Sequence, residues 1–290
     1  MSAPTDEDKT YQSGHFMQVF NKKYTYNLCL IRHYFVSLLL SVVFILVSVS
    51  DALSLEQPNS KLNVAIASNF LFPLKSLLAD YKRLTNTDVR LSAGSTSKLY
   101  AQIINGAPFD VFLSADKQAP QRLVNDGYGE VNGFFAYARG QLVLWSMNDK
   151  FPSSNALENA LVTAKLGRLA MANPKIAPYG RAAKQVLQYL NVRLRPKQMI
   201  IGESVGQSFQ FTESKNVDMG FVAYSQINAT GHKGVVWLVP SEYYQPIDQF
   251  GLILSRTKNL DASKQFVEYL TSRNTQQKLE EEFGYLPKEN

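Results

Sequence analysis

From Lys61 onward, short apolar runs alternate with amphipathic segments, and this alternation restricts the fold more than any other feature of the chain. Leu62–Ala67 has the composition of a buried strand. In the next segment, Pro73–Tyr81, apolar residues recur at helical spacing, and a proline suits the first turn of a helix. Repeated units of this kind predict an α/β fold.

The same alternation continues to the C-terminal end, and the length of 290 residues fits two domains of moderate size. In the first part we expect strands at 88–92, 109–113 and 141–145 and helices at 97–105 and 117–125. Further strands are expected at 169–172, 219–223, 235–239 and 249–254, with helices at 180–190, 205–212, 262–271 and 275–283. The aromatic passage 134–139 marks the place where the chain leaves its first lobe.

The N-terminal region has the pattern of a signal peptide. A polar leader with Lys22, Lys23 and Arg32 precedes an apolar run of 15 residues, Phe35–Val49, that only serines interrupt. A membrane-spanning helix needs about 20 apolar residues, and Ser50-Asp51-Ala52 is a small-x-small cleavage signal. We therefore expect a leader at residues 1–52, cleavage after Ala52 and a periplasmic location. The alternatives are a start at Met17, or an uncleaved segment that stays as an anchor.

Residue counts exclude several kinds of chemistry. The one cysteine, Cys29, would leave with the leader, which removes thiol nucleophiles, thiolate metal sites and a lipid-anchored mature end. Outside the leader the chain has one histidine, His232, so a histidine metal site cannot be built. No nucleophile with a positioned base is evident, and we expect no enzyme. The formal charge of +6 comes from scattered Lys and Arg, so we expect no nucleic-acid partner and no DNA-binding regulator.

Three turns that follow expected strands carry small polar residues and lead into helices. They are Ala67-Ser68-Asn69, Gly94-Ser95-Thr96-Ser97 and Glu203-Ser204-Val205-Gly206. In a doubly wound sheet such turns meet at the carboxyl ends of the strands, where ligands bind. The free N–H groups of helix starts add a preference for anions. The sequence thus indicates an anion pocket, or, as the alternative, residues that only cap helices.

Six stretches, taken together in their order and spacing, resemble the molybdate-binding proteins of ABC importers over almost all of Lys61–Pro287. They are VAIASNF (64–70), SAGSTSKLYAQIINGAPFDVFLSAD (92–116), ARGQLVLWS (138–146), NPKIAPYG (173–180), ESVGQ (203–207) and MGFVA (219–223). The resemblance implies a type II periplasmic-binding-protein fold, two α/β lobes joined by two crossing hinge strands. Lobe I would comprise residues 59–139 and 246–290, and lobe II residues 140–245.

The resemblance also implies a function and a set of ligand residues. A monomer without a cofactor would capture molybdate, and tungstate as well, and deliver it to the membrane permease of the importer. Molybdenum would be bound as its oxyanion, with no direct bond from the protein to the metal. Of the ligand residues, Tyr179 and Val205 would contribute backbone N–H groups. Carried over position by position, the ligand residues are Ser68, Asn69, Ser95, Thr96, Tyr179 and Val205.

The residue after Ser68 decides between two branches of the family. In one branch an Asn follows the first hydroxyl residue, as Asn69 does here. In the other branch that residue is a Ser, and a Tyr donates from the strand that resembles 220–223. Here the Tyr position holds Ala223, and Tyr224 would point to the opposite side if the strand continued. We therefore exclude Tyr224 and expect Asn69 to supply the replacement donor.

The charge of the ligand supports a shell of this composition. Molybdate, tungstate and sulfate carry no proton near neutral pH, so their shell should contain only donors, and a carboxylate in it would repel the dianion. None of the expected ligand residues is acidic, and hydroxyl and amide dipoles can stabilise the charge. We expect the nearest charged residues, Lys98, Arg181 and Glu203, to lie outside the shell. A binding protein for sulfate or another tetrahedral oxyanion is the alternative.

Overall fold

The computed structural model describes residues 61–288, and two five-stranded sheets form its core. The strand order is β2-β1-β3-β10-β4 in the first sheet and β7-β6-β8-β5-β9 in the second. In each sheet three neighbouring strands run parallel and a fourth is antiparallel to them. The α/β class is thereby confirmed. The expected signal peptide, Cys29 and the cleavage point after Ala52 lie outside the described residues.

Each sheet with its helices forms one lobe, and the strand and helix bounds are as follows. The first lobe contains β1 (Lys61–Ala67), the short 3-10 helix η1 (Ser68–Phe70), α2 (Leu71–Thr85), β2 (Asp88–Gly94), α3 (Thr96–Ile104), β3 (Val111–Ser114), α4 (Gln118–Asn125), β4 (Gly129–Gly140), β10 (Ile247–Leu254), α9 (Leu260–Thr271) and α10 (Arg273–Glu281). The second lobe contains β5 (Leu142–Ser146), α5 (Ser154–Val162), β6 (Leu169–Ala172), α6 (Pro178–Tyr189), η2 (Pro196–Gln198), β7 (Met199–Gly202), α7 (Val205–Glu213), β8 (Met219–Ala223), α8 (Tyr224–Thr230), β9 (Val235–Leu238) and η3 (Ser241–Tyr243).

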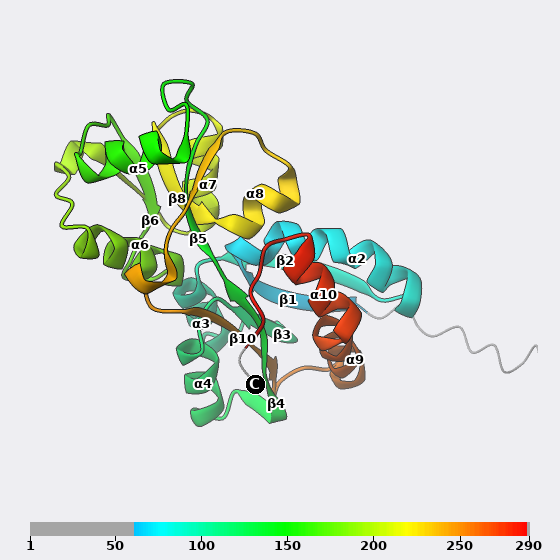
Figure 1. Cartoon of the computed structure of the whole chain (residues 1–290). Helices are drawn as coiled ribbons and strands as arrows, with labels where there is room; N and C mark the ends of the chain where they lie inside the picture. The colour runs from blue at the N-terminus through cyan, green and yellow to red at the C-terminus, as the bar shows by residue number, and fades with distance from the viewer. Residues whose placement is uncertain (1–60, 289–290) are drawn as a thin grey trace, which may run out of the picture. The chain divides into compact units, whose positions relative to one another are not determined.

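The core of the first lobe follows from the alternation of side chains along its strands. In β1, Leu62, Val64 and Ile66 pack with residues of α2, α9 and α10. The intervening Ala65 faces the opposite side and packs with residues of α3 and α4. Successive side chains of a strand point to opposite faces, so a strand with buried apolar side chains on both faces needs helices on both faces of its sheet. Figure 1 shows α3 and α4 on one side of this sheet and α2, α9 and α10 on the other.

The second lobe repeats this arrangement around its own sheet. Helices α5 and α6 lie on one side of the strands, and α7 and α8 lie on the other (Figure 1). On the α7 side, the buried ring of Trp145 stacks on Phe209 with 5.1 Å between the ring centroids. The Trp145 indole N–H also donates to the backbone oxygen of Lys233. A rigid aromatic contact therefore fixes α7, whose first residues enter the site described below.

The two lobes are connected by two crossings of the chain. In the first crossing a single residue, Gln141, separates β4 from β5, so the backbone is nearly continuous between the sheets. The second crossing runs from β9 to β10 and includes the 3-10 turn η3. Gly140, at the end of β4, leaves room for the hydroxyl of Tyr179, which a Cβ at this position would meet. The first crossing therefore lies beside Tyr179, a residue of the candidate site.

Most of the expected elements are present. The strand β4, covering the aromatic passage 134–139, and the 3-10 helices η1, η2 and η3 were not predicted, and neither were three further elements, α5, β7 and α8. The last of these corrects an argument about Tyr224, because β8 ends at Ala223 and Tyr224 begins α8. The premise that a continuing strand turns Tyr224 away is wrong. The ring of Tyr224 instead lies beside Gly284, because a Cβ placed at Gly284 would meet it.

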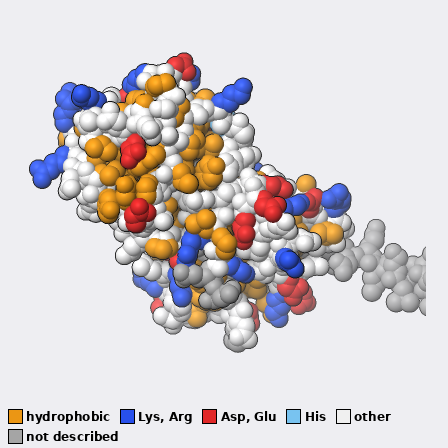
Figure 2. Space-filling view, viewed as in Figure 1, with side chains coloured by type: hydrophobic (Ala, Val, Ile, Leu, Met, Phe, Trp, Pro, Cys, Tyr) orange, Lys and Arg blue, Asp and Glu red, His pale blue; other side chains and the backbone are white. Residues whose placement is uncertain are grey.

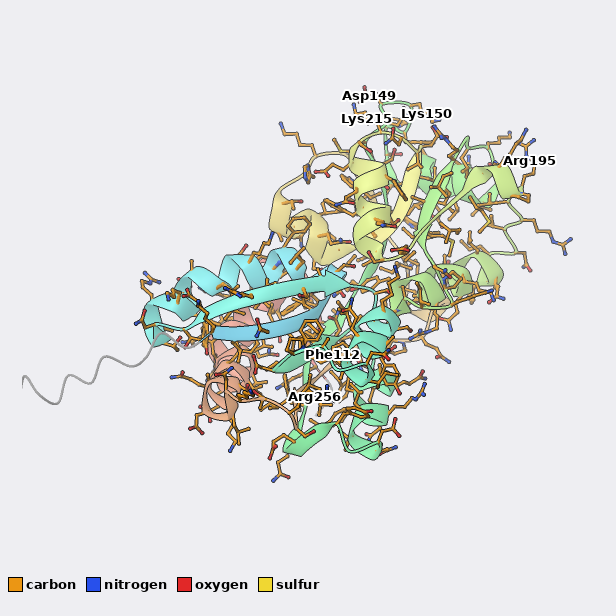
Figure 3. All side chains as sticks on the ribbon, turned by 180° about the vertical axis from the view of Figure 1, so that it is seen from behind. Phe112, Asp149, Lys150, Arg195, Lys215 and Arg256 are labelled. Carbon is orange, nitrogen blue, oxygen red and sulfur yellow. The ribbon has the colours of Figure 1, made fainter. Side chains whose placement is uncertain are left out.

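Charged side chains are spread over the surface of both lobes. Figure 2 shows basic and acidic side chains interspersed over one face. Seen from behind, Asp149, Lys150, Lys215 and Arg195 lie at the outer edge of the second lobe, and Arg256 lies on the first lobe (Figure 3). Within residues 61–288, no helix combines the length and the apolar character that crossing a membrane requires.

Candidate anion-binding site

The parallel strands of both sheets bring helix starts to one place between the lobes. β1 and β2 end directly before Ser68 and Ser95, and in the second lobe α6 and α7 begin at Pro178 and Val205. Ala67, Ala115, Tyr179 and Val205, which lie at these ends, pack in one cluster. The N–H groups of a helix start lack intrahelical acceptors and carry the positive end of the helix dipole. Their convergence from two lobes makes a site for an anion.

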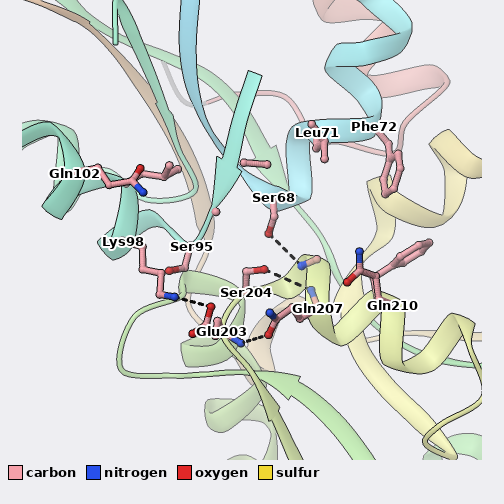
Figure 4. Close-up of a pocket in the computed structure, with 15 residues that line it drawn as sticks. Ser68, Leu71, Phe72, Ser95, Lys98, Gln102, Glu203, Ser204, Gln207 and Gln210 are labelled. Atoms are coloured by element: carbon pink, nitrogen blue, oxygen red, sulfur yellow. Dashed lines mark hydrogen bonds and ion pairs between the residues drawn. The ribbon is translucent and has the colours of Figure 1, made fainter. Parts of the chain in front are cut away.

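A cleft of about 410 Å³ opens beside these helix starts. Ser68, Ser95 and Lys98 line it from the first lobe, and Ser204 and Gly206 line it from the second (Figure 4). Two of the six expected ligand residues, Ser68 and Ser95, thus face the cleft, and Val205 lies between two residues that line it. Asn69, Thr96 and Tyr179 are buried and are not among the residues that line this cleft.

Ser68 joins the lobes directly. Its hydroxyl oxygen accepts a hydrogen bond of 3.0 Å from the N–H of Gly206, in the first turn of α7 (Figure 4). Gly206 permits this approach, because a Cβ at that position would lie 3.0 Å from the Cβ of Ser68. Since the oxygen accepts this bond, the hydroxyl proton of Ser68 can point to an anion in the cleft.

The second lobe offers two backbone donors. Tyr179 and Val205 occupy the first turns of α6 and α7, and within residues 61–288 their N–H groups have no acceptor. Ser204 caps α7 by accepting from the N–H of Gln207, whereas α6 has no side-chain cap. Capping by serine therefore explains Ser204, but it leaves the donors of Tyr179 and Val205 available to a ligand.

Ser95 and Thr96, at the start of α3, differ in what their hydroxyl groups do. The hydroxyl of Ser95 is buried and has no partner in the described part of the chain, and it makes no capping bond. The Thr96 oxygen accepts from the N–H of Ala115 at 3.2 Å and from the Ser114 hydroxyl at 3.4 Å. Thr96 therefore braces the end of β3, while its own proton stays free to donate.

The side-chain amide of Asn69 donates to other residues of the protein, whereas its assignment as an oxyanion donor requires a free N–H group. Its side chain is fully buried, and its amide nitrogen donates to the Gln249 side-chain oxygen at 2.8 Å and to the Tyr285 hydroxyl at 3.2 Å. The amide oxygen, Oδ1, has no partner within the described residues. In this orientation both amide hydrogens are used inside the protein.

The cluster around Asn69 contains residues that sequence reasoning missed. Gln249 on β10 and Tyr285 near the C-terminal end contact Asn69, and Tyr137 on β4 donates to Gln249 at 2.9 Å. Gln249 in turn donates to the Tyr179 hydroxyl at 3.4 Å, so the cluster spans both lobes. Burial raises the pKa of Tyr137, Tyr179 and Tyr285 above the ordinary value for a phenol. These phenols therefore keep their protons as hydrogen-bond donors.

The charged residues near the site pair with one another across the lobes. Lys98 of α3 contacts Glu203 at 2.5 Å, and Arg181 of α6 contacts Asp116 at 2.6 Å. Lys98 and Glu203 are 49% and 58% exposed, which places them at the rim of the cleft. Among the described residues, no group of three or more His, Cys, Asp or Glu side chains could hold a metal ion. The buried part of the site therefore presents neutral donors, the hydroxyl and backbone N–H groups described above.

Comparisons with known proteins show the family to which the chain is similar. A family model described as bacterial extracellular solute-binding protein matches residues 62–286. The molybdate-binding protein ModA of Azotobacter vinelandii is 38% identical over 73% of this chain and 84% of its own length. The protein of the same name from Rhodobacter capsulatus is 38% identical over 71% and 81%.

A solved structure shows the same fold. The periplasmic molybdate-binding protein of Azotobacter vinelandii superposes with a TM-score of 0.74 at 35% sequence identity, over 79% of this chain and all of that one. This match confirms the expected two-lobed fold of periplasmic binding proteins. The chain therefore belongs to the bacterial extracellular solute-binding proteins, in the group that contains the ModA proteins.

Proposed function

We propose that this chain captures molybdate, and tungstate as well, outside the cytoplasm and delivers it to the permease of an ABC importer. The observation that carries the proposal is the meeting of uncharged donors from two lobes, with Ser68 and Ser95 on one side and the N–H groups of Tyr179 and Val205 on the other. Relatives that are 38% identical bear the name molybdate-binding protein. A fully deprotonated tetrahedral oxyanion suits such a shell.

The mechanism is closure of the two lobes on the ligand. We take the moving bodies to be residues 59–139 with 246–290, and residues 140–245. An anion held by the turns of one lobe gains the donors of the other only when the lobes close, and this gain shifts the population toward the closed state. The bond from the Gly206 N–H to the Ser68 hydroxyl shows that donors of α7 reach the first lobe. The closed shape is what the permease would bind.

The proposed ligand residues do not provide groups for acid–base catalysis. None of the six proposed ligand residues is a carboxylate or a histidine that could act as an acid or a base. We propose a monomeric transport component located in the periplasm, without catalysis and without a cofactor. The oxygen atoms of the oxyanion, and not the metal itself, would contact the protein.

Calorimetric titration of the purified protein with molybdate, tungstate, sulfate and phosphate tests this function. We expect molybdate and tungstate to bind most tightly and with one site per chain. Phosphate should bind weakly, because near neutral pH it carries a proton that needs an acceptor. If sulfate binds most tightly, sulfate and not molybdate is the ligand. If none of the four anions binds, the proposed function is wrong.

A further inference from the structure

Gln249 is the one residue of the buried polar cluster that contacts ligand-bearing turns from both lobes. It is fully buried on β10. Its side-chain oxygen accepts from Asn69 at 2.8 Å and from Tyr137 at 2.9 Å, and its nitrogen donates to the Tyr179 hydroxyl at 3.4 Å. Asn69 belongs to the first ligand turn and Tyr179 to the second lobe. The orientation of the Gln249 amide is therefore linked to the orientation of both.

In the observed orientation the hydrogen bonds of this cluster do not balance. The single proton of Tyr137 has two acceptors, the Gln249 oxygen and the backbone oxygen of Ser114, both at 2.9 Å. The Tyr179 hydroxyl accepts from Gln249, but its proton has no acceptor among the described residues. The Asn69 side-chain oxygen, Oδ1, is buried and has no donor within residues 61–288. An acceptor beside the ligand turn would repel a dianion.

Turning over both carboxamides, with rotation of the tyrosine hydroxyl hydrogens, removes these mismatches without moving any other non-hydrogen atom. The nitrogen and oxygen ends of an amide have nearly the same shape, so neighbouring donors and acceptors decide which end is which. Gln249 then donates to Tyr137 and to the Asn69 oxygen, and Tyr137 gives its proton to Ser114. Tyr179 donates to the Gln249 oxygen. Tyr285 turns its proton from the Asn69 backbone oxygen, which still accepts from the Ser225 hydroxyl, to the Asn69 side-chain oxygen. The one group left over is the Asn69 NH₂, a buried donor.

We propose that Gln249 is a positioning residue that sets the orientation of the Asn69 amide, and that oxyanion binding selects the turned-over arrangement, in which Asn69 donates to the ligand. This inference rests on the proposed function. It reconciles the expected role of Asn69 with its observed contacts. A buried amide without an acceptor is costly, so the donating arrangement becomes favourable when an anion accepts from it. The same switch links the anion to Tyr179 in the other lobe.

The binding test compares two replacements of Gln249 with a matched control. Gln249→Glu provides a carboxylate that accepts from Asn69 and Tyr137, which fixes Asn69 with its oxygen toward the ligand. Gln249→Met keeps the length but releases the amide. We expect the molybdate affinity to fall by about 100-fold in Gln249→Glu and by about tenfold in Gln249→Met. Gln198→Glu changes a buried glutamine that bonds to Arg195 and Leu166, away from the cluster, and should retain affinity.

Equal losses in both Gln249 variants, or no loss in either, would overturn the inference, because they would leave Gln249 only a packing role. Thermal unfolding of each variant without ligand shows whether it folds. If Gln249→Glu does not fold, the decision rests on the unmodified protein, through a neutron diffraction structure of its molybdate complex.

Deuterium positions in that neutron structure separate nitrogen from oxygen. We expect the Asn69 nitrogen on the oxyanion and the Gln249 nitrogen on the Asn69 oxygen, whereas an Asn69 nitrogen that still donates to Gln249 would overturn the inference. The two proposals fail differently. A wild-type protein that does not bind molybdate overturns both, and a wild-type protein that binds it with the Asn69 oxygen facing the ligand overturns only this one.

Discussion

The two lobes contribute to the site in different ways. The first lobe supplies side chains, and most of these are already engaged: Ser68 accepts from Gly206, Thr96 braces β3, and Asn69 is bonded to Gln249 and Tyr285. The second lobe supplies the backbone N–H groups of Tyr179 and Val205, which have no acceptor in the described part of the chain. Backbone donors are fixed by the start of a helix, whereas side-chain donors depend on their neighbours.

The largest effect should come from removing one backbone donor of the second lobe. Val205 is the first residue of α7, and the residue before it has extended backbone angles (φ −144°, ψ 165°). Proline fits the first position of a helix and requires such an extended residue before it. Val205→Pro should therefore keep the fold, delete the N–H and weaken molybdate binding by about 3 kcal/mol, which is the upper range for a hydrogen bond to a charged group.

Val205→Ala is the control, since it shortens the side chain and keeps the N–H. Calorimetry should show nearly wild-type affinity for Val205→Ala, and thermal unfolding should show both variants folded. If the proline variant binds as tightly as the alanine variant, the second lobe does not bind the anion through this backbone group, and the contrast between the lobes disappears.

A smaller effect is expected within the first lobe, where Ser95 and Thr96 can be separated. Ser95→Ala removes a buried hydroxyl that has no partner within residues 61–288, so it should lower the affinity about tenfold and leave the free energy of unfolding nearly unchanged. Thr96→Val also removes the acceptor of the Ala115 N–H, so besides weakening binding it should cost about 1 to 3 kcal/mol of stability. Titration and chemical denaturation measure the two quantities.

These variants also test how side chains of the first lobe are used. A stability loss in Ser95→Ala with unchanged affinity would mean that its hydroxyl serves the fold and not the ligand. Unchanged affinity in Thr96→Val would remove Thr96 from the proposed shell and leave it only the bracing role.

The strands and the ligand turns were accessible from the sequence because they depend on local patterns. Leu62–Ala67 and Met219–Ala223 are apolar runs of strand length, and the structure places strands there. The turns that contain Ser68, Ser95 and Val205 were found from their small polar residues before helix starts, and the family resemblance assigned these three residues to the ligand. The limits of α7 were predicted to within one residue, since Ser204 is a strong helix cap.

The rest depends on contacts between residues that are distant in the chain. Gln249 stands in an otherwise ordinary strand, and its partner Asn69 is 180 positions away, so no local pattern indicates that the two amides bond. Tyr285 was missed for the same reason. The helix α8 was missed because β8 continues directly into it, and neither a glycine nor a proline separates Ala223 from Tyr224. Sequence patterns located the turns that carry the proposed donors, but not Gln249 and Tyr285, whose hydrogen bonds fix the Asn69 side chain.

The smallest effect should come from the ion pair at the rim, Lys98 and Glu203, which also joins the lobes. Both side chains are about half exposed, so water and salt screen them, and a surface pair contributes at most about 1 kcal/mol. Lys98→Gln loses the pair and a positive charge near the anion, so its affinity should fall about threefold. Glu203→Gln loses the same pair but also a negative charge, so the two effects oppose and its affinity should stay near that of the wild type.

Titration at low and high salt separates these contributions. The difference between the two variants should shrink as salt rises, because the charges act on the anion through solvent. A loss beyond about tenfold in either variant would exceed what a screened pair can provide, and it would place that residue in contact with the ligand. The neutral donors of the two lobes, which salt screens less because they are buried, would then no longer account for the binding by themselves.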